Sequence, residues 1–118
     1  MSQIQLYGLK NCSTCVKALK WLTARDITCQ LTDYRSHPIA PQTLQTWADQ
    51  LGGFDKLVNR ASTSWRGLSD DQKSASTPEH WLALIAEFPT LIKRPVLVLA
   101  DGQINLGFSE KKYDELFA

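Results

Sequence analysis

In the first third of the chain, apolar residues recur first with the two-residue period of a strand and then with the period of a helix. Apolar and polar residues alternate over Ile4–Tyr7, which predicts a short strand that Gly8 ends. After a turn rich in capping residues, apolar side chains recur at helical spacing over 16–24, which predicts a helix. A second strand is expected over Ile27–Leu31. A strand, a helix and a strand within about 30 residues form a βαβ unit, so the two strands should be parallel.

Helical patterns dominate the middle of the chain. Apolar residues on one face predict a helix over Pro41–Leu51, and Phe54–Val58 predicts one further helical turn. The segment 61–76 is polar and weakly periodic, which indicates a loop with a short helix after Ser69. Another helix should begin at Pro78 and end at the following proline, Pro89.

The last part returns to strands. A buried strand is expected over Val96–Leu99, and Asp101–Gly102 predicts a two-residue hairpin turn before a return strand over Gln103–Leu106. Ser109 should cap a final helix. The whole pattern predicts an α/β protein, with a thioredoxin-like four-stranded mixed sheet, helices on both faces and a helical insertion at about 34–89. We expect one domain over 1–118.

Composition narrows the class of protein. The chain has 118 residues, with 13 basic and 12 acidic side chains and a formal net charge of +1. This balance argues against a nucleic-acid or membrane surface driven by bulk charge. Neither Val96–Ala100 nor any other apolar run is long enough to cross a membrane, and the start of the chain lacks the pattern of a secretory signal. We therefore expect a cytoplasmic protein that binds neither membranes nor nucleic acid directly.

Candidate chemistry begins with Cys12 and Cys15, which form a Cys-x-x-Cys pattern at the start of the first predicted helix. Beside a βαβ unit in a cytoplasmic protein, this pattern is typical of a redox motif. Free N–H groups and the dipole at a helix N-terminus stabilise the reactive thiolate, so we expect Cys12 to be the nucleophile. Cys15 lies one turn further along and is a candidate resolving cysteine.

Other interpretations of the cysteines are open. Cys12 and Cys15 could be two small buried residues or half of a zinc site, but no second Cys-x-x-Cys and no nearby histidine pair exists, so no metal is expected. Cys29 has apolar neighbours in the second predicted strand and should be a buried structural residue. Three cysteines do not make the disulfide framework of a small secreted domain.

Arg94 and Pro95 precede the third predicted strand. In thioredoxin-like folds this position holds a cis-proline beside the active cysteine, so we predict a cis peptide bond between these two residues. Arg94 would then face Cys12, where a guanidinium would lower the thiol pKa and bind an oxyanion or carboxylate through two hydrogen bonds. The alternative is a trans proline beside a solvated surface arginine.

Six short segments in a fixed order carry a resemblance to a known family. They are Leu6–Cys12, Asp33–Arg35, Asn59–Arg60, Thr63–Arg66, Ile92–Pro95 and Leu106–Ser109. With these segments the chain resembles the ArsC/Spx/YffB group of thioredoxin-like proteins over nearly its whole length, and it looks closest to the YffB type. The set is far more specific than the Cys-x-x-Cys pattern alone.

The resemblance implies a nucleophilic Cys12 flanked by Arg60 and Arg94. These arginines, together with Pro95 and Asn11, would form an anion-binding pocket. The glutaredoxin-coupled arsenate reductases carry a third arginine in the fourth-strand region, where this chain has Phe108. The loss of one cation weakens the case for a divalent oxyanion and leaves room for a thiol or disulfide substrate.

The YffB type is thought to use glutathione, so the resemblance implies a glutathione-dependent thiol or disulfide reductase, an oxidoreductase without a bound cofactor. Its partners would be glutathione as co-substrate, a protein or small-molecule disulfide, and glutaredoxin. One alternative is a regulator resembling Spx, in which Cys12 and Cys15 form a redox switch and the protein binds RNA polymerase. A further alternative is an arsenate reductase, against which Phe108 counts.

Overall fold

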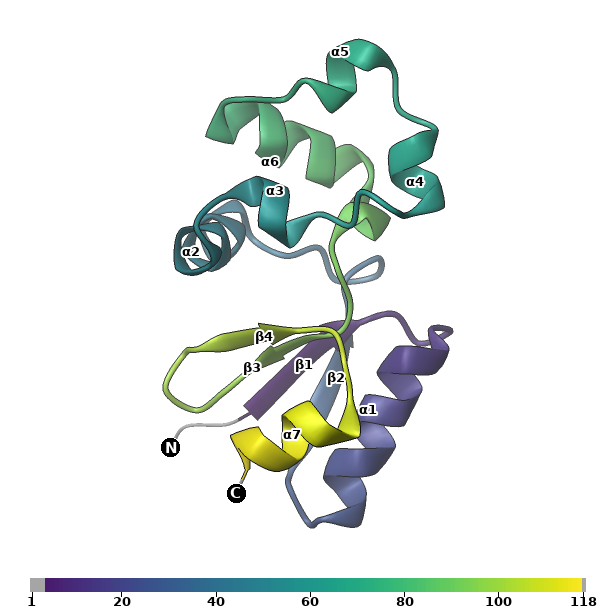
Figure 1. Ribbon diagram of the computed structural model, residues 1–118, viewed down its shortest axis with the longest axis vertical. Coiled ribbons are helices and arrows are strands. Elements are labelled where there is room, and N and C mark those ends of the chain that lie inside the picture. Colours follow the sequence, from purple (N-terminus) through teal and green to yellow (C-terminus); the bar gives the residue numbers. More distant parts are fainter. Residues whose placement is uncertain (1–3, 118) are drawn as a thin grey trace. The chain divides into compact units, whose positions relative to one another are not determined.

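In the computed structural model, which describes residues 4–117, four strands form one mixed sheet (Figure 1). The spatial order is β2 (Cys29–Asp33), β1 (Ile4–Gly8), β3 (Val96–Val98) and β4 (Ile104–Leu106). β1 runs parallel to β2, whereas β3 is antiparallel to both β1 and β4. The prediction of a four-stranded mixed sheet of thioredoxin-like fold, with its first two strands parallel, is confirmed.

Two helices, α1 (Ser13–Ala24) and α7 (Glu110–Leu116), pack on the same face of this sheet. The ring of Trp21 from α1 meets that of Tyr113 from α7 edge to face, with centroids 5.4 Å apart. Burying a large aliphatic side chain contributes about 1.5–3 kcal/mol, so this cluster is a main source of stability. Its members are Leu6, Ala18, Trp21, Leu22, Leu97 and Tyr113.

The chain divides into two compact units, the first formed by 1–37 with 94–118 and the second by 38–93. The second unit contains all the other helices of the described part. They are α2 (Pro41–Leu51), α3 (Phe54–Leu57), α4 (Thr63–Arg66), α5 (Asp70–Lys73), α6 (Pro78–Glu87) and a 3-10 turn, η1 (Pro89–Leu91). The insertion expected at 34–89 is helical, and its bounds lie four residues further along. The single-domain organisation stays a prediction.

Aromatic stacking organises the second unit. The ring of Trp81 on α6 stacks on those of Phe54 and Trp65, with centroid distances of 6.4 and 6.2 Å. Trp81 is buried, and Trp65 is half-buried. Within the described residues, 4–117, no helix combines the length and the apolar character that a membrane span needs.

The start of the second strand and the hairpin connection differ from the sequence prediction for reasons that the hydrogen bonds show. The second strand begins at Cys29 rather than Ile27, because Asp26 adopts a left-handed φ of 58° and the Ile27 N–H bonds back to the Leu22 carbonyl. The β3–β4 hairpin has a three-residue rather than a two-residue connection. The N–H of Leu99 bonds to the Gln103 carbonyl, which leaves 100–102 as the loop, with Gly102 at a φ of 91°.

The helix α4 lies where the sequence predicted a loop. The hydroxyl of Ser62 accepts a hydrogen bond from the Trp65 N–H at 3.1 Å and so caps this single turn. The turn is too short for a hydrophobic period to be visible, which is why the pattern did not predict it. The short helix expected after Ser69 is confirmed as α5, and a capping box between Ser69 and Gln72 starts it.

Candidate active site

Cys12 lies where the chain turns from β1 into α1. Its N–H bonds to the Leu9 carbonyl at 3.2 Å, and its carbonyl accepts the first helical bond from Val16 at 3.0 Å. Cys12 is therefore the N-cap residue of α1, with an extended backbone (φ −87°, ψ 120°). The first turn of α1 contains no acidic residue that would compete for its free N–H groups.

Several donors meet at the Cys12 sulfur. Partial burial by itself raises the pKa of this thiol, but hydrogen bonds outweigh that effect. They come from the backbone and thiol of Cys15, from the Arg94 side chain and from the Thr14 backbone, and they hold the pKa of Cys12 below its ordinary value. Cys12 is half-buried, so a substrate sulfur can reach it.

Cys15 has the opposite character. It is fully buried, and this burial raises the pKa of its thiol to about 11. It packs directly against Gly8 of β1, where a methyl group in place of hydrogen would lie 2.5 Å from the Cys15 sulfur. Glycine at this position therefore makes room for the second cysteine of the motif.

Arg94 reaches the Cys12 sulfur from the segment that precedes β3. The peptide bond between Arg94 and Pro95 is cis, and Arg94 is half-buried. Its guanidinium hydrogen-bonds with both the Cys12 sulfur and the Tyr34 hydroxyl, and these bonds outweigh burial and raise the pKa of Arg94 further. With five N–H donors, the guanidinium can make both contacts and still bind a substrate anion.

Tyr34 is a member of this site that no local pattern of residues predicted. Its side chain is buried, and burial raises the pKa of its hydroxyl despite the hydrogen bond from Arg94. Its backbone N–H bonds to the Gly8 carbonyl at 3.1 Å, which fixes Tyr34 beside the end of β1. The only signal in the sequence was its place in the segment Asp33–Arg35 of the resemblance.

The Asp33 side chain stabilises the loop that precedes Cys12. Its carboxylate accepts hydrogen bonds from the N–H groups of Lys10 at 3.1 Å and Arg35 at 2.9 Å. Backbone donors, first that of Lys10, hold the pKa of this carboxyl below its ordinary range, so it is ionised at neutral pH. The neighbouring Asn11 is exposed in the same loop, and its predicted part in anion binding stays a prediction.

Arg60, which was predicted for the site, and Phe108, which stands in place of a third arginine, lie in different surroundings. Arg60 belongs to the second unit, where its guanidinium is 5.6 Å from the centre of the Trp65 ring. Its role as a second cation beside Cys12 stays a prediction. Phe108 packs edge to face on Tyr113 at 4.7 Å, so the residue that stands in place of the third arginine contributes to the core of the first unit.

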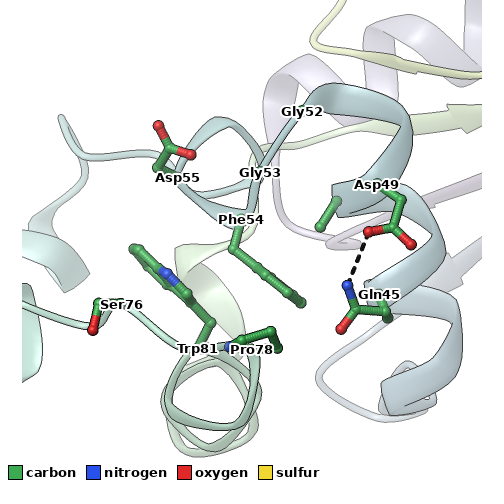
Figure 2. A pocket seen from close by; sticks show the side chains of 10 residues that line it. Gln45, Asp49, Gly52, Gly53, Phe54, Asp55, Ser76, Pro78 and Trp81 are labelled. Carbon is green, nitrogen blue, oxygen red and sulfur yellow. Dashed lines mark hydrogen bonds between the residues drawn. The ribbon is translucent and has the colours of Figure 1, made fainter.

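The second unit has a hollow of its own, with a volume of about 440 Å³ (Figure 2). The rings of Phe54 and Trp81 and the carboxylates of Asp49 and Asp55 line it, and the Gln45 amide donates a hydrogen bond to Asp49 at 3.0 Å. None of the cysteines or arginines predicted for the site contributes to its lining. Cys12, Cys15 and Arg94 are therefore not part of this hollow and belong to the first unit.

Cys12 is the N-cap of a helix on a thioredoxin-like sheet, and the pKa of its thiol lies below the ordinary value. These features define a thiol-based reductase or regulator of this fold. The chain belongs to the ArsC family, whose family model matches residues 7–116. It is 45% identical over 115 residues to an uncharacterised protein of Haemophilus influenzae, covering 98% of this chain and 99% of that relative.

Two further similarities cover most of the chain. The solved structure of a YFFB protein is 33% identical, with a TM-score of 0.88, and the match covers 98% of this chain and 100% of that one. The global transcriptional regulator Spx of Streptococcus pneumoniae is 28% identical over 108 residues, which cover 91% of this chain and 80% of Spx.

Proposed function

We propose that this protein is a cytoplasmic thiol–disulfide oxidoreductase that uses Cys12 as its nucleophile and glutathione as its co-substrate. The observation that carries the proposal is the set of donors at the Cys12 sulfur, which lowers the pKa of this thiol although burial opposes ionisation. A thiolate is the attacking species in disulfide exchange, so a site that stabilises it at neutral pH suits this reaction.

The reaction is a series of thiol–disulfide exchanges. The Cys12 thiolate attacks one sulfur of a substrate disulfide, a bond forms between Cys12 and that sulfur, and the other substrate sulfur leaves as a thiolate that takes a proton from water. A glutathione thiolate then attacks the bound substrate sulfur and releases Cys12. A second glutathione reduces the resulting mixed disulfide, so one substrate disulfide yields two thiols and oxidised glutathione.

The surroundings of Cys15 favour glutathione over Cys15 as the resolving thiol. A thiol with a pKa of about 11 has a very small thiolate fraction at neutral pH, and Cys15 is buried behind Cys12. We therefore propose that Cys15 supports the site mainly by donating hydrogen bonds to the Cys12 sulfur.

Two cysteine variants test this mechanism. Glutathione-dependent reduction of a model disulfide should vanish in Cys12→Ser, because the serine hydroxyl does not ionise at neutral pH. Cys15→Ser should retain a substantial part of that turnover, since glutathione resolves the intermediate. Mass spectrometry of the protein trapped before glutathione is added should show one half of the model disulfide attached to Cys12. Equal loss of turnover in both variants would instead identify Cys15 as the resolving cysteine.

Arg94 has two roles in the proposal, since it hydrogen-bonds the thiolate and can bind a carboxylate of glutathione. Hydrogen bonds to charged groups are worth roughly 1.5–3 kcal/mol, so Arg94→Ala should lower turnover by about ten- to a hundred-fold at matched thiolate fraction. Arg94→Lys should recover little, because a point charge cannot reproduce the planar fork. Unchanged turnover in Arg94→Ala would exclude an arginine-dependent site.

A second candidate function is a redox-sensitive regulator, which the similarity to Spx favours. In this hypothesis oxidation joins Cys12 and Cys15 in a disulfide and changes binding to RNA polymerase. Binding of the purified chain to RNA polymerase, measured before and after oxidation, tests it, with Cys15→Ser as the control. Arsenate reduction ranks third, because Phe108 provides no cation for a divalent oxyanion.

A further inference from the structure

A groove of about 690 Å³ runs along the outer side of α1 in the first unit, between this helix and the start of α7. Thr14, which lies between the two cysteines of the motif, lines one part of it, and Arg25, just after the end of α1, lines another. Lys17 and Lys20 line it as well, with Phe108 as an apolar wall. We call this feature the α1 groove.

The α1 groove is positively charged in a chain that is almost neutral overall. The first 25 residues contain four basic side chains and no acidic one. Lys17 and Lys20 are exposed, and within residues 4–117 neither lies in an ion pair. Arg25 lies over the Trp21 ring at 3.8 Å and 3.7 Å from the Asp114 carboxylate, and the one acidic residue that lines the groove is Glu110. An anion approaching Cys12 along this side therefore meets two unpaired ammonium groups.

The length of the α1 groove indicates the size of the ligand. From Thr14 to Arg25 the backbone advances by about 16 Å at 1.5 Å per residue. An extended tripeptide such as glutathione spans only about 10 Å, whereas roughly five residues of extended peptide span the groove. The groove thus extends further from the cysteine motif than a small thiol reaches, which favours a segment of a protein over free glutathione.

We propose that the α1 groove docks an acidic segment of a protein whose disulfide is the substrate of Cys12. This inference rests on the proposed function and adds to it the substrate class. Lys17 and Lys20 attract the acidic segment, and docking it along α1 brings a neighbouring disulfide to Thr14, two positions after Cys12 in the chain. Electrostatic attraction of this kind acts mainly on the rate of association and weakens with salt.

The test compares two peptides that differ only in charge. Each contains one cysteine in mixed disulfide with thionitrobenzoate, flanked by glutamates in one peptide and by glutamines in the other. Attack by the Cys12 thiolate joins the peptide to Cys12 and releases the coloured thionitrobenzoate anion. At low salt the glutamate peptide should react on the order of tenfold faster, and this preference should disappear as salt screens the charges.

Two double variants that change the net charge equally show which lysines cause the preference for the glutamate peptide. The double variant Lys17→Gln with Lys20→Gln should react with both peptides at nearly equal rates, compared at matched thiolate fraction. Lys56→Gln with Lys73→Gln removes two exposed lysines from the second unit and changes the net charge equally. This control variant should still react faster with the glutamate peptide than with the glutamine peptide. A preference that survives in the groove variant, or is lost equally in the control, overturns the proposal.

A binding experiment separates this proposal from the proposed function. The glutamate peptide with serine in place of cysteine cannot react, so NMR shifts along α1 on its addition report docking alone. Shifts at Lys17 and Lys20 without any reaction at Cys12 would support the groove and contradict the oxidoreductase. The same shifts with glutathione, and none with the peptide, would identify a small anionic thiol as the occupant and overturn a protein partner.

Discussion

At the scale of single residues, the two cysteines of the motif are three positions apart and differ in their chemistry because of what surrounds each sulfur. Cys12 is half-buried and receives several hydrogen bonds, whereas Cys15 is fully buried in the core of the first unit. Donors favour a thiolate and burial disfavours it, so the pKa values of the two thiols move in opposite directions.

This difference predicts selective alkylation. Iodoacetamide should modify Cys12 at neutral pH, while Cys15 should stay unmodified until the pH approaches about 11 or the protein unfolds. Peptide mapping by mass spectrometry over a pH series checks this. Cys29, whose thiol pKa burial also raises to about 11, is the internal control and should react slowly at neutral pH. Equal rates at Cys12 and Cys29 would contradict the assignment of the nucleophile.

Tyr34 is predicted to act on Cys12 through Arg94. Tyr34→Phe keeps the buried ring and removes the hydroxyl that binds the guanidinium, so Arg94 should be held less firmly against the sulfur. A hydrogen bond is worth about 0.5–1.5 kcal/mol, which corresponds to a rise of up to about one unit in the pKa of Cys12.

The pH profile of Cys12 alkylation measures this effect of Tyr34, and a merely structural role would not move that profile. Arg94→Ala serves as the reference and should raise the pKa of Cys12 at least as much. A profile in Tyr34→Phe identical to the unaltered protein would show that the hydroxyl does not position Arg94.

At the scale of elements, the site depends on how closely β1 approaches α1. Gly8 ends β1, and its missing side chain leaves the space that the Cys15 sulfur occupies. The Gly8 carbonyl also accepts the Tyr34 N–H, so a shift of this strand end would displace both Cys15 and the tyrosine that binds Arg94.

A double-mutant cycle should detect this contact. Gly8→Ala places a methyl group 2.5 Å from the Cys15 sulfur, and overpacking of this kind costs about 1–3 kcal/mol of the free energy of unfolding. Adding Cys15→Ala removes the clashing sulfur, so the double variant should be less destabilised than the sum of the single ones. Urea unfolding of the four proteins measures the coupling. Strict additivity would mean that the two residues do not compete for space.

At the scale of the whole molecule, the buried thiol of Cys15 and the half-buried thiol of Cys29 link stability to alkaline pH. Burial raises the pKa of Cys15 and of Cys29 from 9.0 to about 11. Between these values the unfolded chain has lost protons that the folded chain still holds, so the free energy of unfolding should fall as the pH rises from about 9 to about 11. Urea unfolding under reducing conditions at several pH values checks this. The slope should be smaller in Cys29→Val, and an unchanged slope would exclude Cys29 as a contributor.

Much of the fold follows from local patterns in the sequence. The strands, the long helices and the parallel pairing of β1 with β2 were predicted, because period-two and helical periods of apolar residues report directly on local backbone geometry. Boundaries were less predictable. The left-handed turn at Asp26 and the Ser62 cap of α4 each depend on one or two hydrogen bonds, which leave no periodic trace.

The motif, too, was determined by the sequence alone, since two cysteines at the start of a predicted helix already indicate a reactive thiol at Cys12. The partners of that thiol were decided only by the tertiary structure. Tyr34 and Arg94, whose side chains are hydrogen-bonded, are 60 positions apart in the chain. Gly8, at the end of β1, packs against the sulfur of Cys15 in α1. Such contacts depend on sheet register and on side-chain packing, whose energies are shared among many residues, so no local pattern encodes them.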